Sequence, residues 1–275
     1  MAQLRATLPL LRAKVTTEVR PRLLVATAHL ALQGGWMSFD SNRHDAARRL
    51  WMIGLSVARE ADHPQGTDLG VYLLHDLAQQ AVHLGRPREA LSLVHLGHIT
   101  AVSSHPVSAA TNRSLAGTQA LAHAVQGDAA GCDRALGEAE EHFSVIDPAT
   151  RPPWGAHLSD TVRLAGSTQY RLALNSSDPH AAGRAVPLLR HAVDHLGVDH
   201  ARDRALLLAS LAGAHAIAGD TDTAVSVGHQ AVDAVTAVHS PRAYDRLRVL
   251  DTALEPLHTS TGVAELRDRL AVSTV

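Results

Sequence analysis

Apolar residues recur at intervals of three and four along nearly the whole chain, and no segment alternates apolar and polar residues as a half-buried strand would. Glycine, proline and helix-capping residues interrupt this pattern about every twenty residues. The pattern predicts an all-α protein with one long loop, at Asp147–Gly155, and with helices that Pro187 and Pro256 start, kink or shorten. The predicted helices cover residues 3–19, 22–39, 43–61, 67–84, 87–103, 107–126, 128–144, 157–175, 179–196, 200–218, 221–238, 241–258 and 261–272.

Four of the predicted turns share one plan. A first helix ends, a turn that usually contains glycine follows, and a small residue five positions later on the second helix lets the two backbones approach closely. These turns lie at Phe39–Ala47, Val82–Ala90, Val125–Cys132 and Ile217–Ala224, and a degenerate unit at Leu158–Leu196 fills the remaining gap. The series predicts a right-handed α-solenoid of five to six antiparallel helix pairs over residues 22–275, with residues 1–21 as an N-terminal capping helix.

The same stretches resemble a known family. The segment LQGGWMSFDSNRHDAARRLW at residues 32–51, with Ala58–Asp62, His83–Leu91 and the Pro152-Pro153-Trp154 loop, is similar to the C-terminal tetratricopeptide-like sensor region of bacterial XRE-type helix-turn-helix regulators. The resemblance covers roughly residues 22–258. Residues 1–20 are too short for the DNA-binding domain of those regulators. The resemblance therefore implies a sensor scaffold without direct nucleic-acid binding by this chain, which either acts alone or is part of a longer protein.

Composition narrows the class of protein. Of 275 residues, 45% are hydrophobic and 19% charged, which is enough apolar material for a core and too little charge for a disordered chain. A formal net charge of −2 and few aromatic residues argue against a nucleic-acid-binding surface. A single cysteine, Cys132, fits a reducing compartment, and no apolar run is as long as a membrane span. A cytoplasmic protein with no membrane partner is expected.

The candidate binding surface follows from the repeat. In tetratricopeptide folds the first helix of each pair lines the concave face, which is the usual binding surface. Setting this face from the turns places a mixture of polar, charged and aromatic residues there, which an Ala- and Leu-rich solenoid does not need for packing. The alternative is that several of them, Trp36 included, only pack against neighbouring helices. The predicted ligand-binding residues are His29, Trp36, Asp40, Tyr72, His75, Asp76, Gln79, His83, Asp160, Arg163, Ser167 and Arg171, with Tyr170 beside the last of them.

Histidine is the residue type that suggests chemistry, with 19 copies; a GC-rich coding bias that accounts for most of them is the alternative to a functional subset. His191 and His195, four residues apart, are weak candidates for a transition-metal site, which still needs a third ligand. A second cluster, suited to a non-haem metal or to general acid–base catalysis, comprises His29, His75, His83, Asp40 and Asp76. No nucleophile motif and no cofactor-binding loop are present in the sequence, so no catalytic residue is assigned and no cofactor is expected, with a histidine-bound transition metal as the alternative.

Two functions of different classes remain. The first is a non-enzymatic tetratricopeptide-like binding and regulatory module that recognises a peptide, a partner protein or a small metabolite in its concave groove. The second is a helical-repeat protein recruited as a metal-dependent or acid–base enzyme of small-molecule metabolism. Because the open ends of a solenoid need a cover, a two-fold homodimer is also expected. The apolar faces that suggest it carry Leu4, Leu8, Leu11 and Val15 near the N-terminus and Leu247, Val249, Leu250 and Leu254 near the C-terminus.

Overall fold

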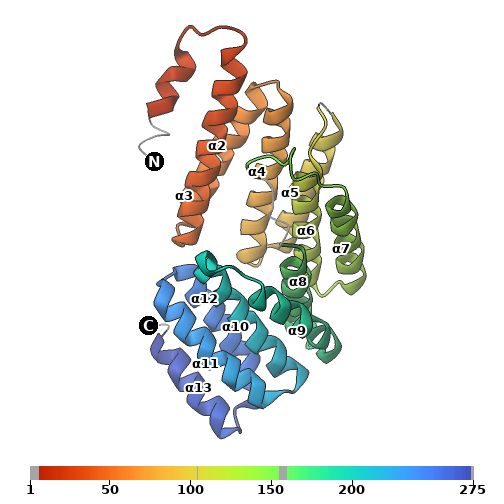
Figure 1. Ribbon diagram of the computed structural model, residues 1–275, viewed down its shortest axis with the longest axis vertical. Coiled ribbons are helices and arrows are strands. Elements are labelled where there is room, and N and C mark those ends of the chain that lie inside the picture. Colours follow the sequence, from red (N-terminus) through yellow and green to blue (C-terminus); the bar gives the residue numbers. More distant parts are fainter. Residues whose placement is uncertain (1–5, 104, 155–159, 274–275) are drawn as a thin grey trace. The chain divides into compact units, whose positions relative to one another are not determined.

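The protein is all-helical. The structure, a computed structural model, describes residues 6–103, 105–154 and 160–273. Within these ranges the chain forms twelve α-helices and no β-strand, which confirms the all-α prediction (Figure 1). The helices are α2 (Val19–Asp40), α3 (His44–Glu60), α4 (Pro64–His83), α5 (Pro87–Ser103), α6 (Ala109–Gln126), α7 (Ala129–Ser144), α8 (Asp160–Ser176), α9 (Pro179–Asp194), α10 (Ala201–Ala218), α11 (Thr221–Val238), α12 (Pro241–Leu254) and α13 (Thr261–Ser273).

The predicted turns have one backbone geometry. In each turn, a residue with positive φ lies two positions before the start of the second helix. The residue directly after it donates its backbone N–H to the carbonyl oxygen of the residue five positions before that donor. This 6→1 hydrogen bond with a left-handed residue is a common way to close the C-terminus of a helix. The hydrogen bonds are Arg43 to Ser38, Arg86 to Ala81, Asp128 to His123, Asp178 to Ala173 and Asp220 to His215.

The fourth bond in that series belongs to a turn that the sequence showed only as a degenerate unit. Ser177, with φ of 51°, stands there where three of the other turns have glycine. The small residue that follows each turn is fully buried, as the close-packing argument predicts: these residues are Ala47, Ala90, Cys132, Ala182 and Ala224. The turns therefore repeat five times along the chain.

Proline begins several helices, as predicted. Pro87, Pro179 and Pro241 open α5, α9 and α12, where a missing N–H costs no helical hydrogen bond. The carboxylate of Asp178 caps α9 by accepting a hydrogen bond from the His180 N–H at 2.8 Å. Pro256 ends α12 in a 3₁₀ turn, whereas Pro187 lies inside α9.

The continuous helix predicted over residues 3–19 is wrong. The described part of this segment forms a short 3₁₀ helix, Leu8–Arg12, and α2 begins only at Val19. The β-branched run Val15-Thr16-Thr17 disfavours a helix. The Thr16 hydroxyl also accepts a hydrogen bond from the Val19 N–H at 3.3 Å. This bond satisfies a free N–H at the start of α2, so the segment begins a new helix instead of continuing the previous one.

The helices are grouped into two compact units. Unit 1 comprises Met1–Ala122 and Asp133–Ala156, and unit 2 comprises His123–Cys132 and His157–Val275. In unit 1, α2 packs against α3 and α4, and α4 packs against α5. The core of unit 1 contains Leu24, Leu32, Phe39, Trp51, Leu69, Leu73 and Leu77, and a second cluster contains Val71, Val94 and Leu115.

In unit 2, α10 is the central helix and packs against α8, α9, α11 and α12, while α13 packs against α11 and α12. Leu247, Leu250 and Leu254 of α12 are fully buried in this core. The apolar face that was expected to lie open at the C-terminal end is thus covered within its own unit, because α10 and α13 both contact α12.

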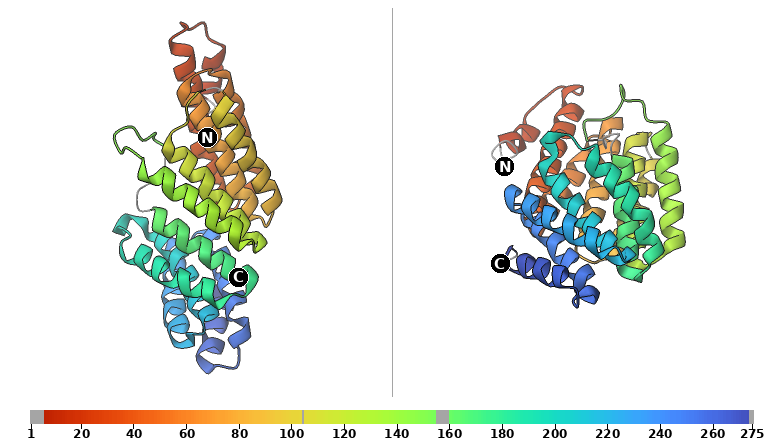
Figure 2. Two further views of the ribbon diagram at one scale, coloured as in Figure 1. Left: turned by 90° about the vertical axis from the view of Figure 1, so that its right-hand side faces the viewer. Right: turned by 60° about the horizontal axis from the view of Figure 1, so that its bottom comes forward.

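First and second helices of the pairs differ in burial. The buried residues of α3 form one stripe at helical spacing, namely Ala47, Leu50, Trp51, Gly54 and Ala58. In α10, by contrast, every residue from Leu207 to Ala216 is buried. The neighbouring antiparallel helices of each unit can be followed from two further directions in Figure 2. Neighbouring helices therefore enclose α4 and α10 on several sides, whereas α3 is buried along one face only.

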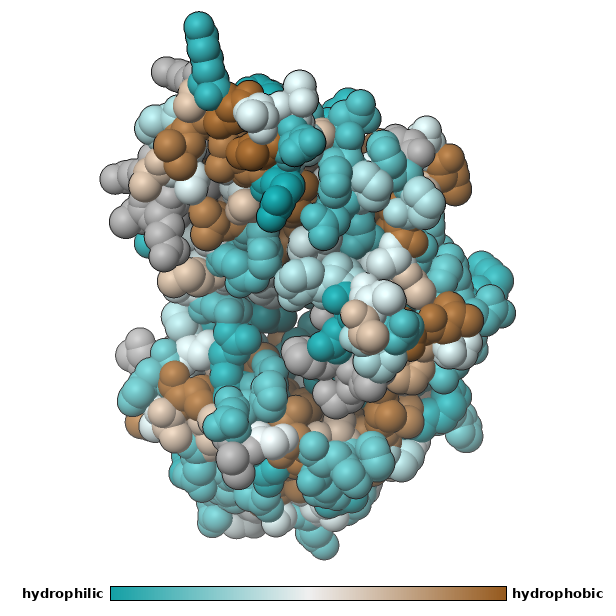
Figure 3. All heavy atoms as spheres, turned by 45° about the horizontal axis from the view of Figure 1, so that its top comes forward, coloured by the Kyte–Doolittle hydropathy of each residue, from teal (hydrophilic) through white to brown (hydrophobic). Residues whose placement is uncertain are grey.

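The surface carries both hydrophilic and apolar side chains. Hydrophilic side chains cover most of the face drawn in Figure 3, and apolar side chains appear there as separate patches. The exposed large apolar side chains include Met37, Met52, Ile53, Leu96, Ile99 and Val102. None of the described helices combines the length and the apolar character that crossing a bilayer requires.

Candidate functional site

The predicted ligand-binding residues of unit 1 lie on two first helices. His29, Trp36 and Asp40 belong to α2, and the other five belong to α4: Tyr72, His75, Asp76, Gln79 and His83. Helix α4 buries thirteen of its twenty residues, and four of these are polar or charged: Asp68, His75, Asp76 and Gln80. Because buried polar groups cost free energy unless they find partners, the contacts of these four residues show what the face can do.

His75 and Asp76 are the most deeply placed of the predicted site residues. His75 Nδ1 lies 2.7 Å from the Thr118 hydroxyl of α6, and His75 Nε2 lies 3.5 Å from the Gln79 amide nitrogen. The distance from His75 Nε2 to the nearer Asp76 oxygen is 3.6 Å, longer than a hydrogen bond. The Tyr72 ring packs against the imidazole, with 5.0 Å between ring centroids.

Burial keeps both groups in their neutral forms. It lowers the pKa of His75 to about 3; a hydrogen bond to the Ser114 backbone opposes this shift and the charge of Arg113 adds to it. Burial also raises the pKa of Asp76 well above its ordinary value, and the Trp36 indole partly offsets the rise. Desolvation therefore outweighs ion pairing between these two neighbours.

Asp76 is the least satisfied polar group on this face. Its side chain is fully buried. Although the Trp36 indole approaches it, neither carboxyl oxygen has a hydrogen bond of normal length and angle with a described residue. A buried acceptor left in this state costs about 1–3 kcal/mol.

An aromatic cluster lies beside this pair. The Trp36 ring makes edge contacts with Phe39 and Trp51, at centroid distances of 5.6 and 5.7 Å. His83 packs edge-on against Phe39, with 5.2 Å between ring centroids, and in a tilted arrangement against His44 at the same centroid distance. Trp36 thus packs on the core, as the packing interpretation expects, and also lies close to Asp76, as the ligand hypothesis expects.

A further polar network of unit 1 was missed by sequence reasoning. The buried Asp68 carboxylate accepts hydrogen bonds from the Trp154 indole at 2.9 Å, from the Ser108 N–H at 2.7 Å and from the Thr111 hydroxyl at 3.2 Å. The Trp154 ring also makes an edge contact with His29 at 5.7 Å. The sequence had marked the Pro-Pro-Trp loop, but no local signal connects it with Asp68. The network ties the loop to α4 and α6.

The predicted site residues of unit 2 lie on α8. Arg163 pairs with Asp203 of α10 at 3.8 Å. Ser167 and Arg171 are half-buried. Asp160 is the first residue of α8, and its side chain lies outside the described part of the chain. These residues belong to a different unit from His75 and Asp76. Within unit 1, the structure brings Tyr72, Asp76 and Gln79 to His75, and Trp36 to Asp76. His29 instead contacts Trp154, and His83 contacts Phe39 and His44.

Two histidines at the ends of first helices have a structural role that the sequence did not reveal. His215 Nδ1 lies 3.0 Å from Asp220, the N-cap of α11, and its Nε2 lies 3.1 Å from an Arg190 nitrogen. Because arginine only donates, His215 Nε2 accepts this bond and has no lone pair left to act as a base. His123 Nδ1 lies 2.9 Å from an Asp128 carboxylate oxygen at the corresponding turn, but without the geometry of a hydrogen bond.

The proposed metal ligands, His191 and His195, are exposed and contact each other. The rings of His191 and His195 stack at 3.9 Å, and His195 Nδ1 lies 2.9 Å from the His191 carbonyl oxygen. Across the described ranges, no three or more His, Cys, Asp or Glu side chains are grouped so that they could hold a metal ion.

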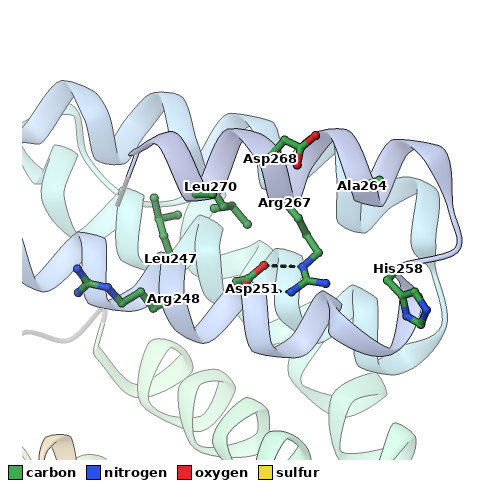
Figure 4. Close-up of a pocket in the computed structure, with 9 residues that line it drawn as sticks. Leu247, Arg248, Asp251, His258, Ala264, Arg267, Asp268 and Leu270 are labelled. Atoms are coloured by element: carbon green, nitrogen blue, oxygen red, sulfur yellow. Dashed lines mark hydrogen bonds and ion pairs between the residues drawn. The ribbon is translucent and has the colours of Figure 1, made fainter. Parts of the chain in front are cut away.

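Two cavities flank the last helix of unit 2. One, of about 410 Å³, lies between α12 and α13 and is crossed by the ion pair of Asp251 and Arg267, with 2.7 Å between the nearest atoms (Figure 4). The other, of about 750 Å³, lies between α11 and α13, where Arg269 contacts Asp233. Ion pairs within the protein already engage Asp251, Arg267, Asp233 and Arg269, which line these cavities. Neither cavity includes a residue predicted to bind a ligand.

Comparisons with known proteins add no identification. No protein family matches this sequence, and no curated protein matches it.

Proposed function

We propose that the protein is a binding and regulatory module of the tetratricopeptide-like type, built as a right-handed solenoid of antiparallel helix pairs, and that it holds a ligand on the first-helix face of unit 1 without chemical conversion. The repeated turn geometry and the central position of α4 support the repeat architecture. The face that α2 and α4 contribute supplies aromatic, imidazole and carboxyl groups.

The observation that carries this proposal is the buried carboxyl group of Asp76. An uncompensated carboxyl group in the interior reduces stability, so stability alone does not favour it at this position. Carboxyl groups with strongly shifted pKa values cluster at functional sites. A ligand with an ammonium or amide N–H group would supply the missing donor, and the neighbouring Trp36 and Tyr72 rings would contact its apolar or cationic part.

The experiment is a thermal-shift screen of the full chain with primary amines, amino-acid amides and short peptides. Three forms are compared: wild type, Asp76→Asn and Asp45→Asn. Asp45 is an exposed carboxylate on α3 of the same unit, so its variant makes the same charge change away from the site. We expect at least one probe to stabilise wild type and Asp45→Asn by about 2.7 kcal/mol at 100 times its Kd, with no comparable shift for Asp76→Asn.

Two outcomes contradict the proposal. If the probes that bind do so equally well to Asp76→Asn, the site lies elsewhere; if no probe binds wild type, this face does not take such a ligand. The enzymatic alternative has its own test, metal analysis of protein purified without a histidine tag. One equivalent of copper, iron or zinc per chain would favour that alternative over the proposed binding module.

A further inference from the structure

The loop after α7 places a tryptophan on the first-helix face of unit 1. The structure describes all of residues 147–154, and Trp154 alone among them is buried, with 7% of its surface exposed. Its indole donates to Asp68, which lies about two helical turns before His75 on α4 and hence on the same side of that helix. The predicted ligand-binding residue His29 of α2 contacts the Trp154 ring edge-on. The loop therefore occupies one end of the face that we propose holds a ligand.

The residues around the indole form a socket that suits a ring with an N–H donor. We call Asp68, Ser108, Thr111 and His29 the Trp154 socket. The Asp68 side chain is 6% exposed, and its oxygens accept hydrogen bonds from the Trp154 indole, the Ser108 N–H and the Thr111 hydroxyl. All three donors are electrically neutral. Because a buried acceptor is costly when it loses a donor, the socket favours an indole over a ring without an N–H group.

The segment that carries Trp154 has the character of a bound peptide. Pro152 and Pro153 precede the tryptophan, and consecutive prolines favour an extended conformation that loses little entropy on binding. Earlier in the loop, the Ala149 N–H donates to the Asp147 side chain at 2.9 Å, which closes a turn within the loop itself. Trp154 is thus a large side chain inserted from an irregular, proline-containing segment, an arrangement that peptide-binding domains use to anchor their ligands.

We propose that the Trp154 socket is a binding site for a tryptophan-bearing, proline-containing segment of a partner protein, and that the chain's own loop occupies it as an intramolecular competitor. The inference rests on the proposed function, since both place a ligand on the first-helix face of unit 1. A partner segment inserts its own indole in place of Trp154, donates to Asp68 and releases the loop. The chain connection to α7 gives the loop an effective concentration on the order of 1 mM, so removing its indole should strengthen binding of a free peptide.

The test is fluorescence anisotropy of a labelled peptide with the sequence of residues 147–154, titrated with the full chain. We expect Trp154→Ala to bind this peptide at least about tenfold more tightly than wild type. Adding Asp68→Asn to Trp154→Ala should weaken binding about tenfold or more. Adding Asp45→Asn, which removes an exposed carboxylate on α3, should change nothing and is the matched control. Peptides with alanine or phenylalanine in place of the tryptophan should bind at least about tenfold and threefold more weakly.

A second variant keeps the test decisive if Trp154→Ala does not fold. Trp154→Phe fills the socket without an N–H donor, so it should bind the peptide about threefold to tenfold more tightly than wild type, and it is combined with Asp68→Asn in the same way. Circular dichroism melting shows which variants are folded.

The proposal is overturned if the peptide binds wild type and the folded loop variants equally, or binds none of them. It is also overturned if Asp68→Asn, or loss of the tryptophan from the peptide, leaves the affinity unchanged. The amine probes described above depend on Asp76, whereas this peptide depends on Asp68. Failure of one experiment is therefore distinguishable from failure of the other.

Discussion

Asp76 and His75 are neighbours whose pKa values move in opposite directions for one reason, burial. The folded-state pKa of Asp76 lies above the unfolded value of 3.8. Its contribution to stability is therefore complete below that value and is lost as the pH rises through the folded pKa. Asp76→Asn does not titrate. We expect the free energy of unfolding of Asp76→Asn, relative to wild type, to increase with pH from about 4 upward.

Urea denaturation at unit pH steps from 5 to 8 measures this difference, with Asp45→Asn as the control for loss of an exposed carboxylate. Parallel stability curves for wild type and Asp76→Asn would show that Asp76 keeps an ordinary pKa, contrary to the burial argument.

For His75 we expect stability to depend on pH in the opposite direction. Its pKa falls from 6.5 in the unfolded chain to about 3 in the folded one. The stability associated with the neutral imidazole is present above pH 6.5 and is lost as the pH falls toward 3, with a slope of up to about 1.4 kcal/mol per pH unit. His75→Gln should lose this part of the acid sensitivity in denaturation experiments between pH 6.5 and 4. A variant with unchanged acid sensitivity would place the titrating group elsewhere.

At the scale of the element, a glycine on the first helix of a pair leaves space for an aromatic side chain from the second helix. A Cβ atom on Gly35 of α2 would lie 2.1 Å from the Trp51 indole nitrogen, which donates a hydrogen bond to the Leu32 carbonyl at 3.2 Å. Gly35→Ala should therefore lower the free energy of unfolding by about 1–3 kcal/mol, since the fully buried Trp51 must move. The control is Gly137→Ala on α7, where the added methyl group meets open space and should stabilise the helix by up to about 1 kcal/mol. Equal stability of both variants would contradict close packing at Gly35.

The loop after α7 is held by its contact with α4. Asp68→Asn keeps the shape of the side chain but replaces one acceptor oxygen by a donor, which faces the N–H groups of Trp154 and Ser108. We expect a loss of about 1–3 kcal/mol in the free energy of unfolding and faster chymotryptic cleavage after Trp154 in the released loop. Asp45→Asn again supplies the control. Cleavage at the wild-type rate would mean that the loop is held without this network.

At the scale of the whole molecule, self-association remains a prediction. Leu4 lies outside the described residues, and Leu247, Leu250 and Leu254 are covered within unit 2. The remaining support is the N-terminal segment, where Leu10 and Val15 are exposed. We expect a mass of twice 29.2 kDa in light scattering at micromolar concentration, and a monomer for a Leu10→Asp, Val15→Asp double variant. A wild-type monomer would count against the dimer.

The sequence by itself determined the helices and most of the turns. Helical periodicity, proline at first positions, glycine at positive φ and small residues after the turns are local signals, and each acts within a few residues of where it is read. For this reason α5, α9 and α12 start where Pro87, Pro179 and Pro241 predict. The N-terminal segment escaped because a hydroxyl cap replaced the usual signals. The turn before Pro179 was placed correctly, but it was assigned only to a degenerate unit, because Ser177 stands at its positive-φ position instead of glycine.

Only the tertiary structure decided which polar residues are buried and which of them meet. Spacing placed His75, Asp76 and Gln79 on one first helix, but enclosure by neighbouring helices made the first two buried and left Gln79 half-exposed. Trp154 and Asp68 are 86 residues apart, yet the Trp154 indole donates a hydrogen bond to the buried Asp68 carboxylate. Desolvation and such contacts depend on how distant segments pack together, so no local pattern of residues contains them.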